Sequence, residues 1–586
     1  MIIADQVNTA LHPALAANAP SGARLLARAF ARHGITVAFG QSTPSLFHLI
    51  APDHGIRQVA YRTETAGGAM ADGLARTSNR IALVTAQNGP GAALLVAPLA
   101  EALKASVPVI ALVQEVTPLA ADRNAFQELD HVALFSGVTK WVRRIDDVER
   151  VEDYVDLAVA TATGGRPGPV VLMVPAQILA ATATTEGRRQ VRMGHVPLDR
   201  PVPDAAALAE AARLLAGARQ PLIIAGGGIH LSQAQAALAD LQERFHLPVA
   251  TTLMGKGAVD ECHALSLGII GHVMGEGARA EKLFDFVRGA DVVLLVGNRT
   301  NENGTGHWRL YPRGATYLHL DIDGQEVGRN YESHRLVGDA RAGLMALADQ
   351  LARTDPARRI ATRPGIEATI ASARDHYRAA LAARLARPAP SDAGQVRPEA
   401  VMAELDALLM ADDIVVSDAS YASVWTANYL TARRAGMRFL SPRGLAGLGW
   451  GLPMAIGARI ACPDQRVFCV TGDGGFAHCW AELETAVRLG LRLPIIALNN
   501  QILGYQKDAE DMLFGAHTEA CTFAPVDHAA LARACGAKGI RVTDRAEVAP
   551  ALQQALDHDG PTVIDIITDA AARPPLSFYR GRFPEA

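Results

Sequence analysis

Short runs of apolar residues recur along this 586-residue chain, and each is followed by a glycine-containing turn and an alanine-rich stretch. Continuous apolar strands that alternate with helical segments are typical of parallel sheets covered on both faces. The pattern therefore predicts an α/β protein with doubly wound parallel sheets. The clearest strand candidates are residues 81–86, 108–113, 169–175, 221–228, 290–297, 466–474 and 493–500.

Two polar, proline-containing stretches, residues 183–204 and 387–399, have the composition of linkers. They divide the chain into three blocks of ordinary domain size. We expect three α/β domains followed by a short tail. The expected bounds are 1–185, 200–355 and 390–575 for the domains and 576–586 for the tail.

Composition and charge narrow the class of protein. The formal net charge is -4 and the acidic and basic residues are interspersed, which argues against nucleic acid and anionic membranes as partners. No apolar run is long enough to span a membrane, and the N-terminus lacks the pattern of a signal peptide. Six cysteines in so long a chain argue against a disulfide scaffold, and the lack of a C-x-x-C pair argues against a zinc or redox site. A cytoplasmic location fits these features best.

The most specific chemistry lies at the ends of two successive strands in the third block. Asp473 follows one apolar run and Asn500 follows the next, with a helix-like segment over residues 481–490 between them. Such a βαβ unit has parallel strands, so both side chains are expected at the carboxyl edge of the sheet. An isolated G-D-G is usually a plain strand-to-helix turn. The paired asparagines at this spacing favour a ligand site instead.

The residue types at this edge suit Mg²⁺ bound to a diphosphate. Mg²⁺ prefers oxygen ligands, and Asp473, Asn500 and the backbone carbonyl of Ile502 would supply three, with phosphate oxygens completing the shell. Glycines allow backbone N–H groups to approach phosphates closely. The glycines concerned are Gly472, Gly474 and Gly475.

Residues 472–500 resemble the diphosphate-binding signature of thiamine-diphosphate enzymes. Residues 443–458 resemble the segment of the acetohydroxyacid (acetolactate) synthase family that surrounds the pyrimidine ring of the cofactor. In that family a bulky apolar residue at the position of Leu448 holds the cofactor in a bent form; a plain core leucine is the alternative. The resemblance implies further cofactor contacts from Asn88, Ser420, Tyr421, Ala446, Leu503 and Gly504.

Residues 61–76 resemble the family motif whose glutamate activates the cofactor, which places that glutamate at Glu64. In the family this carboxylate bonds to the aminopyrimidine ring and promotes removal of a proton from the thiazolium ring. A glutamate at a helix start is more often a solvated cap. The family-like segment at residues 82–95 favours the catalytic role.

Residues 124–130 resemble the wall of the family's substrate channel. The resemblance implies Phe126 and Gln127 as substrate contacts, with Gln127 as a catalytic hydrogen-bond donor. Lys140 is either a cation on the substrate side or a surface charge. Gln41 and Ser42 stand in the loop that shapes the reaction chamber.

Several positions depart from the acetohydroxyacid synthase pattern. The G-x-P-G loop of the first domain reads GQSTPS over residues 40–45, Thr63 replaces a histidine, and Ala509 replaces the tryptophan that selects the second keto acid. We therefore keep three hypotheses. The first is a carboligase acting on a 2-oxo acid such as pyruvate, and the second is a lyase or decarboxylase of the acyloin or 2-hydroxyacyl-CoA lyase type. The third, a catalytically silent cofactor-binding protein, is disfavoured by Glu64, Asp473 and Asn500.

The resemblance also covers the middle block and the assembly. It implies a pyrimidine-binding first domain, a Rossmann-like middle domain and a diphosphate-binding third domain. Gly297 and Arg299 would face a flavin or an ADP group, since relatives hold FAD, ADP or neither there. In this family the activating glutamate of one subunit meets the cofactor held by another. The resemblance thus implies a homodimer or homotetramer with active sites between subunits.

Overall fold

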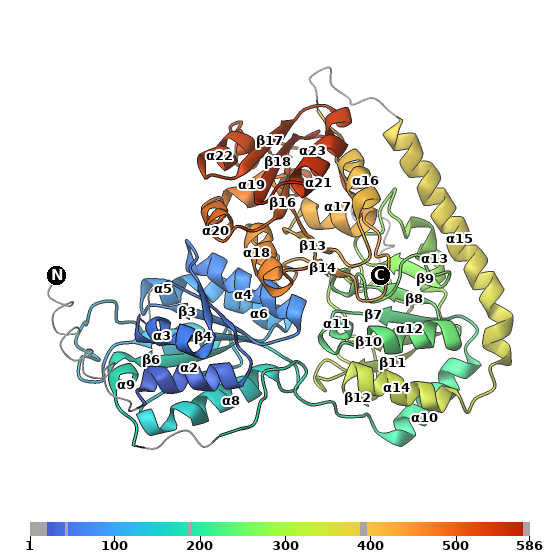
Figure 1. Cartoon of the computed structure of the whole chain (residues 1–586). Coiled ribbons are helices and arrows are strands. Elements are labelled where there is room, and N and C mark those ends of the chain that lie inside the picture. Colours follow the sequence, from blue (N-terminus) through green and yellow to red (C-terminus); the bar gives the residue numbers. More distant parts are fainter. Residues whose placement is uncertain (1–19, 42–44, 185–188, 387–394, 578–586) are drawn as a thin grey trace. The chain divides into compact units, whose positions relative to one another are not determined.

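Three six-stranded sheets, in each of which all paired strands run parallel, make up the protein (Figure 1). This computed structural model describes residues 20–41, 45–184, 189–386 and 395–577. The chain divides into two compact units, one of residues 1–198 with 442–463 and the other of 199–441 with 464–586. The predicted fold class, α/β with three doubly wound parallel sheets, is confirmed.

The first unit contains one sheet, with the strand order β2-β1-β3-β4-β6-β5. Strands β3 and β6 of this sheet are mostly apolar and buried along their whole length, as expected of a sheet covered by helices on both faces. The strands are β1 (Val37–Phe39), β2 (Arg57–Val59), β3 (Ala82–Ala86), β4 (Val109–Glu115), β5 (Trp141–Arg144) and β6 (Val170–Pro175). The helices are α2 (Gly22–Arg32), α3 (Ser45–Ile50), α4 (Glu64–Ser78), α5 (Pro90–Leu94), α6 (Val96–Ala105), α7 (His131–Ser136), α8 (Val151–Thr163), α9 (Ala176–Ala180) and α18 (Gly451–Ala461).

The second unit contains the other two sheets, which differ in topology. The middle sheet has the order β12-β11-β10-β7-β8-β9, and the third sheet, β14-β13-β15-β16-β18-β17, repeats the order of the first. Open α/β sheets bind ligands where the strand order reverses, which is between β7 and β10 and between β13 and β15. The strands are β7 (Pro221–Ala225), β8 (Val249–Thr251), β9 (Ser266–Ile269), β10 (Val292–Val296), β11 (Thr316–Asp321), β12 (Ser333–Val337), β13 (Ile414–Ser417), β14 (Arg438–Leu440), β15 (Val467–Gly472), β16 (Leu493–Asn499), β17 (Lys538–Val542) and β18 (Pro561–Ile567).

Helices cover these two sheets in the usual alternation with the strands. They are α10 (Ala205–Gly217), α11 (Gly228–Leu231), α12 (Gln235–Arg244), α13 (Phe284–Arg288), α14 (Ala340–Leu351), α15 (Ala357–Leu385), α16 (Pro398–Leu408), α17 (Tyr421–Tyr429), α19 (Asp473–Ala477), α20 (Glu482–Arg488), α21 (Gly504–Phe514), α22 (His528–Ala534) and α23 (Val548–Leu556). No helix in the described ranges is both long and apolar enough to cross a membrane. All six cysteines are free thiols.

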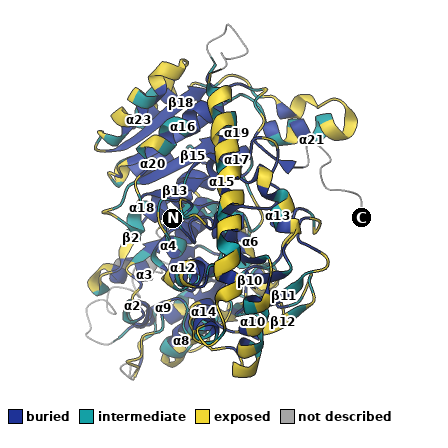
Figure 2. Cartoon of the chain, turned by 90° about the vertical axis from the view of Figure 1, so that its right-hand side faces the viewer, coloured by how far each residue is buried: buried dark blue, intermediate teal, exposed yellow. Residues whose placement is uncertain are grey.

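The long helix α15 fills the interval between residues 355 and 390, where the sequence predicted no element. Ile366 and Ile370 belong to the core beneath the middle sheet, whereas Leu381 and Leu385 pack against the core of the third sheet. Its outer side is exposed along its length (Figure 2). The helix therefore braces the two sheets of this unit.

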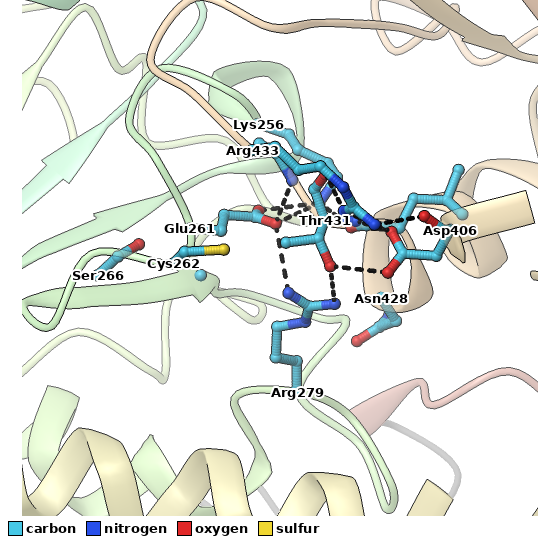
Figure 3. Close-up of polar contacts among 12 residues, drawn as sticks. Lys256, Glu261, Cys262, Ser266, Arg279, Asp406, Asn428, Thr431 and Arg433 are labelled. Carbon is cyan, nitrogen blue, oxygen red and sulfur yellow. Dashed lines mark hydrogen bonds and ion pairs between the residues drawn. The ribbon is translucent and has the colours of Figure 1, made fainter. Parts of the chain in front are cut away.

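A buried ionic cluster also joins these two sheets (Figure 3). Lys256 Nζ lies 2.9 Å from Glu261 Oε1 and donates to the carbonyl oxygen of Leu430 at 2.7 Å. Glu261 also accepts from the backbone N–H of Ala432 at 3.0 Å, and Arg279 lies 3.6 Å from the same carboxylate. The loop after β8 thereby holds the loop that follows α17.

The predicted tail begins against the middle sheet. The backbone N–H of Gly275 donates to the carbonyl oxygen of Pro575 at 3.1 Å, and that of Ser577 donates to His272 at 2.8 Å. Leu576 is buried in the core of the third sheet. Residues 578–586, which make up nearly all of the predicted tail, lie outside the described residues.

Candidate active site

The carboxyl edge of the third sheet brings Asp473 to the loop that contains Asn500. Strand β15 pairs in parallel with β16, and Gly472 lies opposite Leu498, so both strands end at the same level. Asp473 Oδ2 accepts a hydrogen bond from the backbone N–H of Gln501 at 2.9 Å. The βαβ arrangement expected from the sequence is present, with α20 between the strands.

Asp473 is a buried carboxylate at the end of β15. Only 6% of the residue is exposed, and burial raises the pKa of its carboxyl to about 6, although backbone N–H groups oppose the shift. Within the described part of the chain, no lysine, arginine or histidine forms an ion pair with Asp473. A buried charge needs a partner, and a bound cation would serve as one. The environment of Asp473 therefore fits a metal ligand.

The loop after β16 is held in a shape that keeps this edge open. Gln501 adopts a positive φ of 61°, and the backbone N–H of Leu503 donates to the carbonyl oxygen of Cys521 at 2.8 Å. Asn500 Oδ1 accepts from the backbone N–H of Ile502 at 3.3 Å. At Gly472 an added Cβ would meet no atom within 4 Å. These features fit a cradle for a diphosphate group.

Close packing explains the glycine at position 474. A Cβ there would lie 2.9 Å from Leu503 Cδ2 and 3.0 Å from Phe523 Cε2. Ser420, with a φ of 61°, ends the connection after β13, and Tyr421 begins α17 at the same edge. The residues predicted to contact the diphosphate thus come from the ends of β13, β15 and β16, the three strands around the point where the order reverses.

Glu64 is the first residue of α4 in the first unit. Thr63 caps the helix by accepting a hydrogen bond from the backbone N–H of Ala66 at 3.3 Å. The Glu64 side chain lies against Gly91, where an added Cβ would be 3.1 Å from Glu64 Oε1. The cap is therefore supplied by Thr63, and the half-buried Glu64 carboxylate lies beside Gly91 in the first turn of α5.

Asn88, a predicted cofactor contact, lies next to Phe126 and Gln127, the predicted substrate contacts. Asn88 Nδ2 donates to the carbonyl oxygen of Gln127 at 3.0 Å, and Gln87 Nε2 donates to Gln127 Oε1 at 2.6 Å. Gln127 adopts a positive φ of 62°, and the Phe126 side chain is 72% exposed. Residues held in such uncommon backbone conformations cluster at functional sites.

Two further residues support this turn and were missed in the sequence. The backbone N–H of Gly89 donates to His131 Nε2 at 2.9 Å, and His131 Nδ1 is hydrogen-bonded to the Glu115 carboxylate. An Nε2 that accepts requires the proton on Nδ1, so Glu115 sets the tautomer of the ring. The only signal in the sequence for His131 is its position directly after the NAFQELD motif. Nothing in the sequence indicates its pairing with Glu115.

The segment with Ala446 and Leu448 packs on α4 within the first unit. An added Cβ at Gly73 would be 2.2 Å from the carbonyl oxygen of Met454 in α18, so the backbones touch. The buried carboxylate of Glu101 in α6 accepts hydrogen bonds from the backbone N–H groups that lead into this segment. Ala446 is exposed with a φ of 62°, and Leu448 is partly buried. Glu101 is a third supporting residue, after His131 and Glu115, that the sequence did not indicate.

The ammonium group of Lys140 is bound by backbone carbonyl oxygens near the end of α8. Its Nζ donates to three backbone carbonyl oxygens at or after the end of α8, those of Thr161, Gly164 at 3.1 Å and Arg166 at 2.8 Å. Cations are stabilised at helix C-termini. Of the two alternatives left open, this geometry supports a structural charge.

The loop at residues 40–45 is only partly described. Gln41 is exposed, and its Nε2 lies 3.5 Å from the carbonyl oxygens of Tyr61 and Arg62, just before Glu64. Ser42 lies outside the described residues. Gln41 is thus placed near the start of α4, which begins at Glu64.

The point where the strand order of the middle sheet reverses is tightly packed. An added Cβ at Gly297 would be 2.6 Å from Gly228 Cα, and Gly297 has a φ of 53°. This backbone contact explains two glycines of the run after β7, Gly226 and Gly228. Burial raises the pKa of Asp321, at the end of β11, to about 6. The positive charge of the partly buried Arg299 acts in the opposite direction and lowers the pKa of that carboxyl.

Comparison with known proteins matches every block to the same kind of enzyme. Residues 20–134, 208–347 and 418–566 match the N-terminal TPP binding domain, the central domain and the C-terminal TPP binding domain of thiamine pyrophosphate enzymes. The chain is 31% identical over 578 residues to the acetolactate synthase large subunit of Parasynechococcus marenigrum, covering 94% of this chain and 88% of that protein.

Other relatives agree with this similarity. An acetolactate synthase of Arthrospira platensis is 31% identical over 560 residues, covering 93% of this chain and 94% of the relative. The acetolactate synthase isozyme 2 large subunit of Escherichia coli is 29% identical over 558 residues, covering 94% of this chain and 96% of its own. The similarity therefore extends over nearly the whole chain.

Proposed function

Because this chain belongs to the thiamine pyrophosphate enzymes, in the family of the acetolactate synthases, we propose that it is a carboligase that joins a 2-oxo acid such as pyruvate to a second carbonyl compound. The observation that carries the proposal is the buried Asp473 carboxylate, which has no ion-pair partner among the described residues and lies at the strand ends beside the Asn500 loop. A magnesium–diphosphate group would supply the missing cation there.

Each site residue then has a definite task. Asp473, Asn500 and the carbonyl of Ile502 would hold Mg²⁺, and Gly472, Gly474 and Gly475 would face the diphosphate. When bound, the cofactor supplies the electron sink for the carbanion chemistry. The Glu64 carboxylate would orient the cofactor ring and keep a negative charge beside it. Gln87 engages Gln127 Oε1, which directs the N–H groups of Gln127 Nε2 towards a substrate carbonyl oxygen.

Further cofactor contacts are proposed on the same basis. Asn88 is hydrogen-bonded to the backbone of Gln127, while Ala446 and Leu448 are presented from the segment that Glu101 holds. Ser420, Tyr421, Leu503 and Gly504 lie at the diphosphate edge. Phe126, Gln41 and Ser42 are proposed for the substrate. Lys140 is not included, because three backbone carbonyls already engage its ammonium group.

We also propose a homodimer or homotetramer, in which Glu64 of one subunit completes the site held by Asp473 of another. Light scattering of the purified protein would give the assembly mass. FAD at the point where the order of the middle sheet reverses is a separate proposal, which a flavin absorption spectrum of the purified protein tests directly. A spectrum without flavin would leave the carboligase proposal intact.

Product analysis tests the function. The protein with Mg²⁺, thiamine pyrophosphate and pyruvate is expected to form acetolactate together with CO₂. Acetaldehyde with CO₂ and no acetolactate would instead identify a simple decarboxylase. The second candidate is a lyase of acyloins or 2-hydroxyacyl-CoA. It is favoured by Ala509, which stands where the acetohydroxyacid synthases have a tryptophan, and by the altered loop that contains Gln41. That activity would show as cleavage of those substrates without ligation of pyruvate.

Replacing Asp473 is expected to remove cofactor binding. Asp473→Ala deletes a direct metal ligand, so the affinity for thiamine pyrophosphate should fall by more than the roughly 10- to 100-fold that loss of an outer-shell partner costs. Calorimetric titration at fixed Mg²⁺ measures the change. The control is Asp413→Ala, which removes a buried carboxylate paired with Arg466 just before β13, at the opposite edge of the sheet. Unchanged affinity in Asp473→Ala would contradict the metal assignment.

A further inference from the structure

A hydrogen-bonded pair, Tyr421 and Asp508, spans the carboxyl edge of the third sheet. The Tyr421 hydroxyl donates to Asp508 Oδ2, and the two residues are 87 positions apart in the sequence. Tyr421 begins α17, after β13, and Asp508 lies in α21, after β16. Strand β15, which carries Asp473 at its end, lies between those two strands. The pair therefore bridges the elements on either side of Asp473.

Close packing adds to the hydrogen bond. Gly504, the first residue of α21, touches the Tyr421 ring, since an added Cβ would lie 2.9 Å from Tyr421 Cε2 and 3.5 Å from Asn500 Nδ2. Residues four apart lie on the same face of a helix, so Gly504 and Asp508 present one side of α21 to Tyr421. The Tyr505 ring packs edge-on against the Tyr421 ring, with 5.9 Å between the ring centroids. The start of α21, and with it the loop from Asn500, is seated on Tyr421.

The Asp508 carboxylate is almost fully buried and is balanced by two cations. Asp508 is 2% exposed. Its Oδ1 lies 3.0 Å from Arg573 Nη2 and 3.3 Å from Lys507 Nζ. A buried carboxylate with this set of donors has one well-defined orientation. It also links the start of the C-terminal segment, through Arg573, to α21.

We propose that Asp508, acting through Tyr421, is a positioning residue that holds the Asn500–Gly504 loop in the geometry that binds the magnesium–diphosphate group. The inference rests on the proposed function. Asp508 would act without being a metal ligand: through Tyr421 it would fix the backbone that presents the ligand oxygens of Asn500 and Ile502. Outer-shell partners of this kind tune metal affinity strongly. The ion pair between Arg573 and Asp508 connects the start of the C-terminal segment to the same group of residues.

The test compares cofactor binding with the stability of the apoprotein. Asp508→Asn and Tyr421→Phe are each expected to weaken binding of Mg²⁺–thiamine pyrophosphate by about 10- to 100-fold, measured by calorimetric titration. The double variant should lose no more than the worse single variant, because both remove the same contact. Arg573→Met should shift affinity in the same direction. The thermal midpoint of the Tyr421→Phe apoprotein should stay close to that of the unaltered chain, whereas Asp508→Asn removes a buried charge and should lower it.

Tyr429→Phe is the matched control. Tyr429 ends the same helix α17, is buried, and meets Arg384 at 3.0 Å instead of α21. Equal weakening in Tyr429→Phe, or full affinity in both Asp508→Asn and Tyr421→Phe, would overturn the inference. If the unaltered chain bound no Mg²⁺–thiamine pyrophosphate, the proposed function itself would fail, which is a different result. If Asp508→Asn did not fold, Tyr421→Phe would still decide the matter.

Discussion

Glu64→Gln is expected to reduce turnover by about 10²- to 10⁴-fold while leaving the affinity for thiamine pyrophosphate near that of the unaltered protein. Glutamine keeps the shape of the side chain beside Gly91, but it carries no negative charge to activate the cofactor ring. The helix itself should stay intact, because Thr63 supplies the N-cap. Steady-state kinetics gives the loss of turnover. The rate of deuterium exchange at the thiazolium carbon, followed by NMR, reports the activation step directly.

Glu152→Gln is the matched control for this prediction. Glu152 lies in the first turn of α8 in the same unit, so its replacement removes the same charge from a helix start. Turnover should be unchanged in that variant. If Glu64→Gln retained full deuterium exchange and turnover, Glu64 would have no activating role, and the glutamate would be a helix-terminal charge only.

Glu261→Ala is expected to destabilise the second unit by about 3–5 kcal/mol. The Lys256 and Glu261 side chains are 2% and 1% exposed, and burial lowers the pKa of Lys256. Burial alone would raise the pKa of Glu261, but Lys256 and Arg279 hold it below its ordinary value. Removing the carboxylate leaves a buried ammonium group, and the backbone N–H of Ala432 loses its acceptor. The shift of the thermal and urea unfolding midpoints measures the loss.

Two further variants isolate the cause. The paired replacement Lys256→Met with Glu261→Leu removes both charges, and it should recover much of the stability, since apolar pairs often replace buried ion pairs without loss. Asp375→Asn removes one partner of an exposed pair with Arg378, whose side chains are about three-quarters exposed. Its effect should stay within about 0.5 kcal/mol. Equal effects of Glu261→Ala and Asp375→Asn would show that burial of the first pair does not matter.

The sequence was sufficient for the fold class and the family because both depend on local signals. Apolar strands without alternation predict a parallel sheet wherever they occur, and the three sheets confirm this. The family follows from motifs at strand ends, and the relatives confirm it over 94% of the chain. The roles of the individual site residues, the domain bounds and the cytoplasmic location stay predictions. Helix α15 was missed because its many charged residues resemble an extension of the linker.

What the sequence by itself determined is which residues stand at the ends of strands: Asp473 and Asn500 follow adjacent apolar runs, and a parallel crossover leaves them at one edge. Only the tertiary structure decided which side chains support that edge. Asp508 meets Tyr421 across 87 positions, and Glu101 meets the backbone of Gly444 across 343. Periodicity reports the neighbours of a residue along its own helix or strand. Partners that arrive from another element leave no such pattern, because their pairing is set by how the helices pack on the sheet.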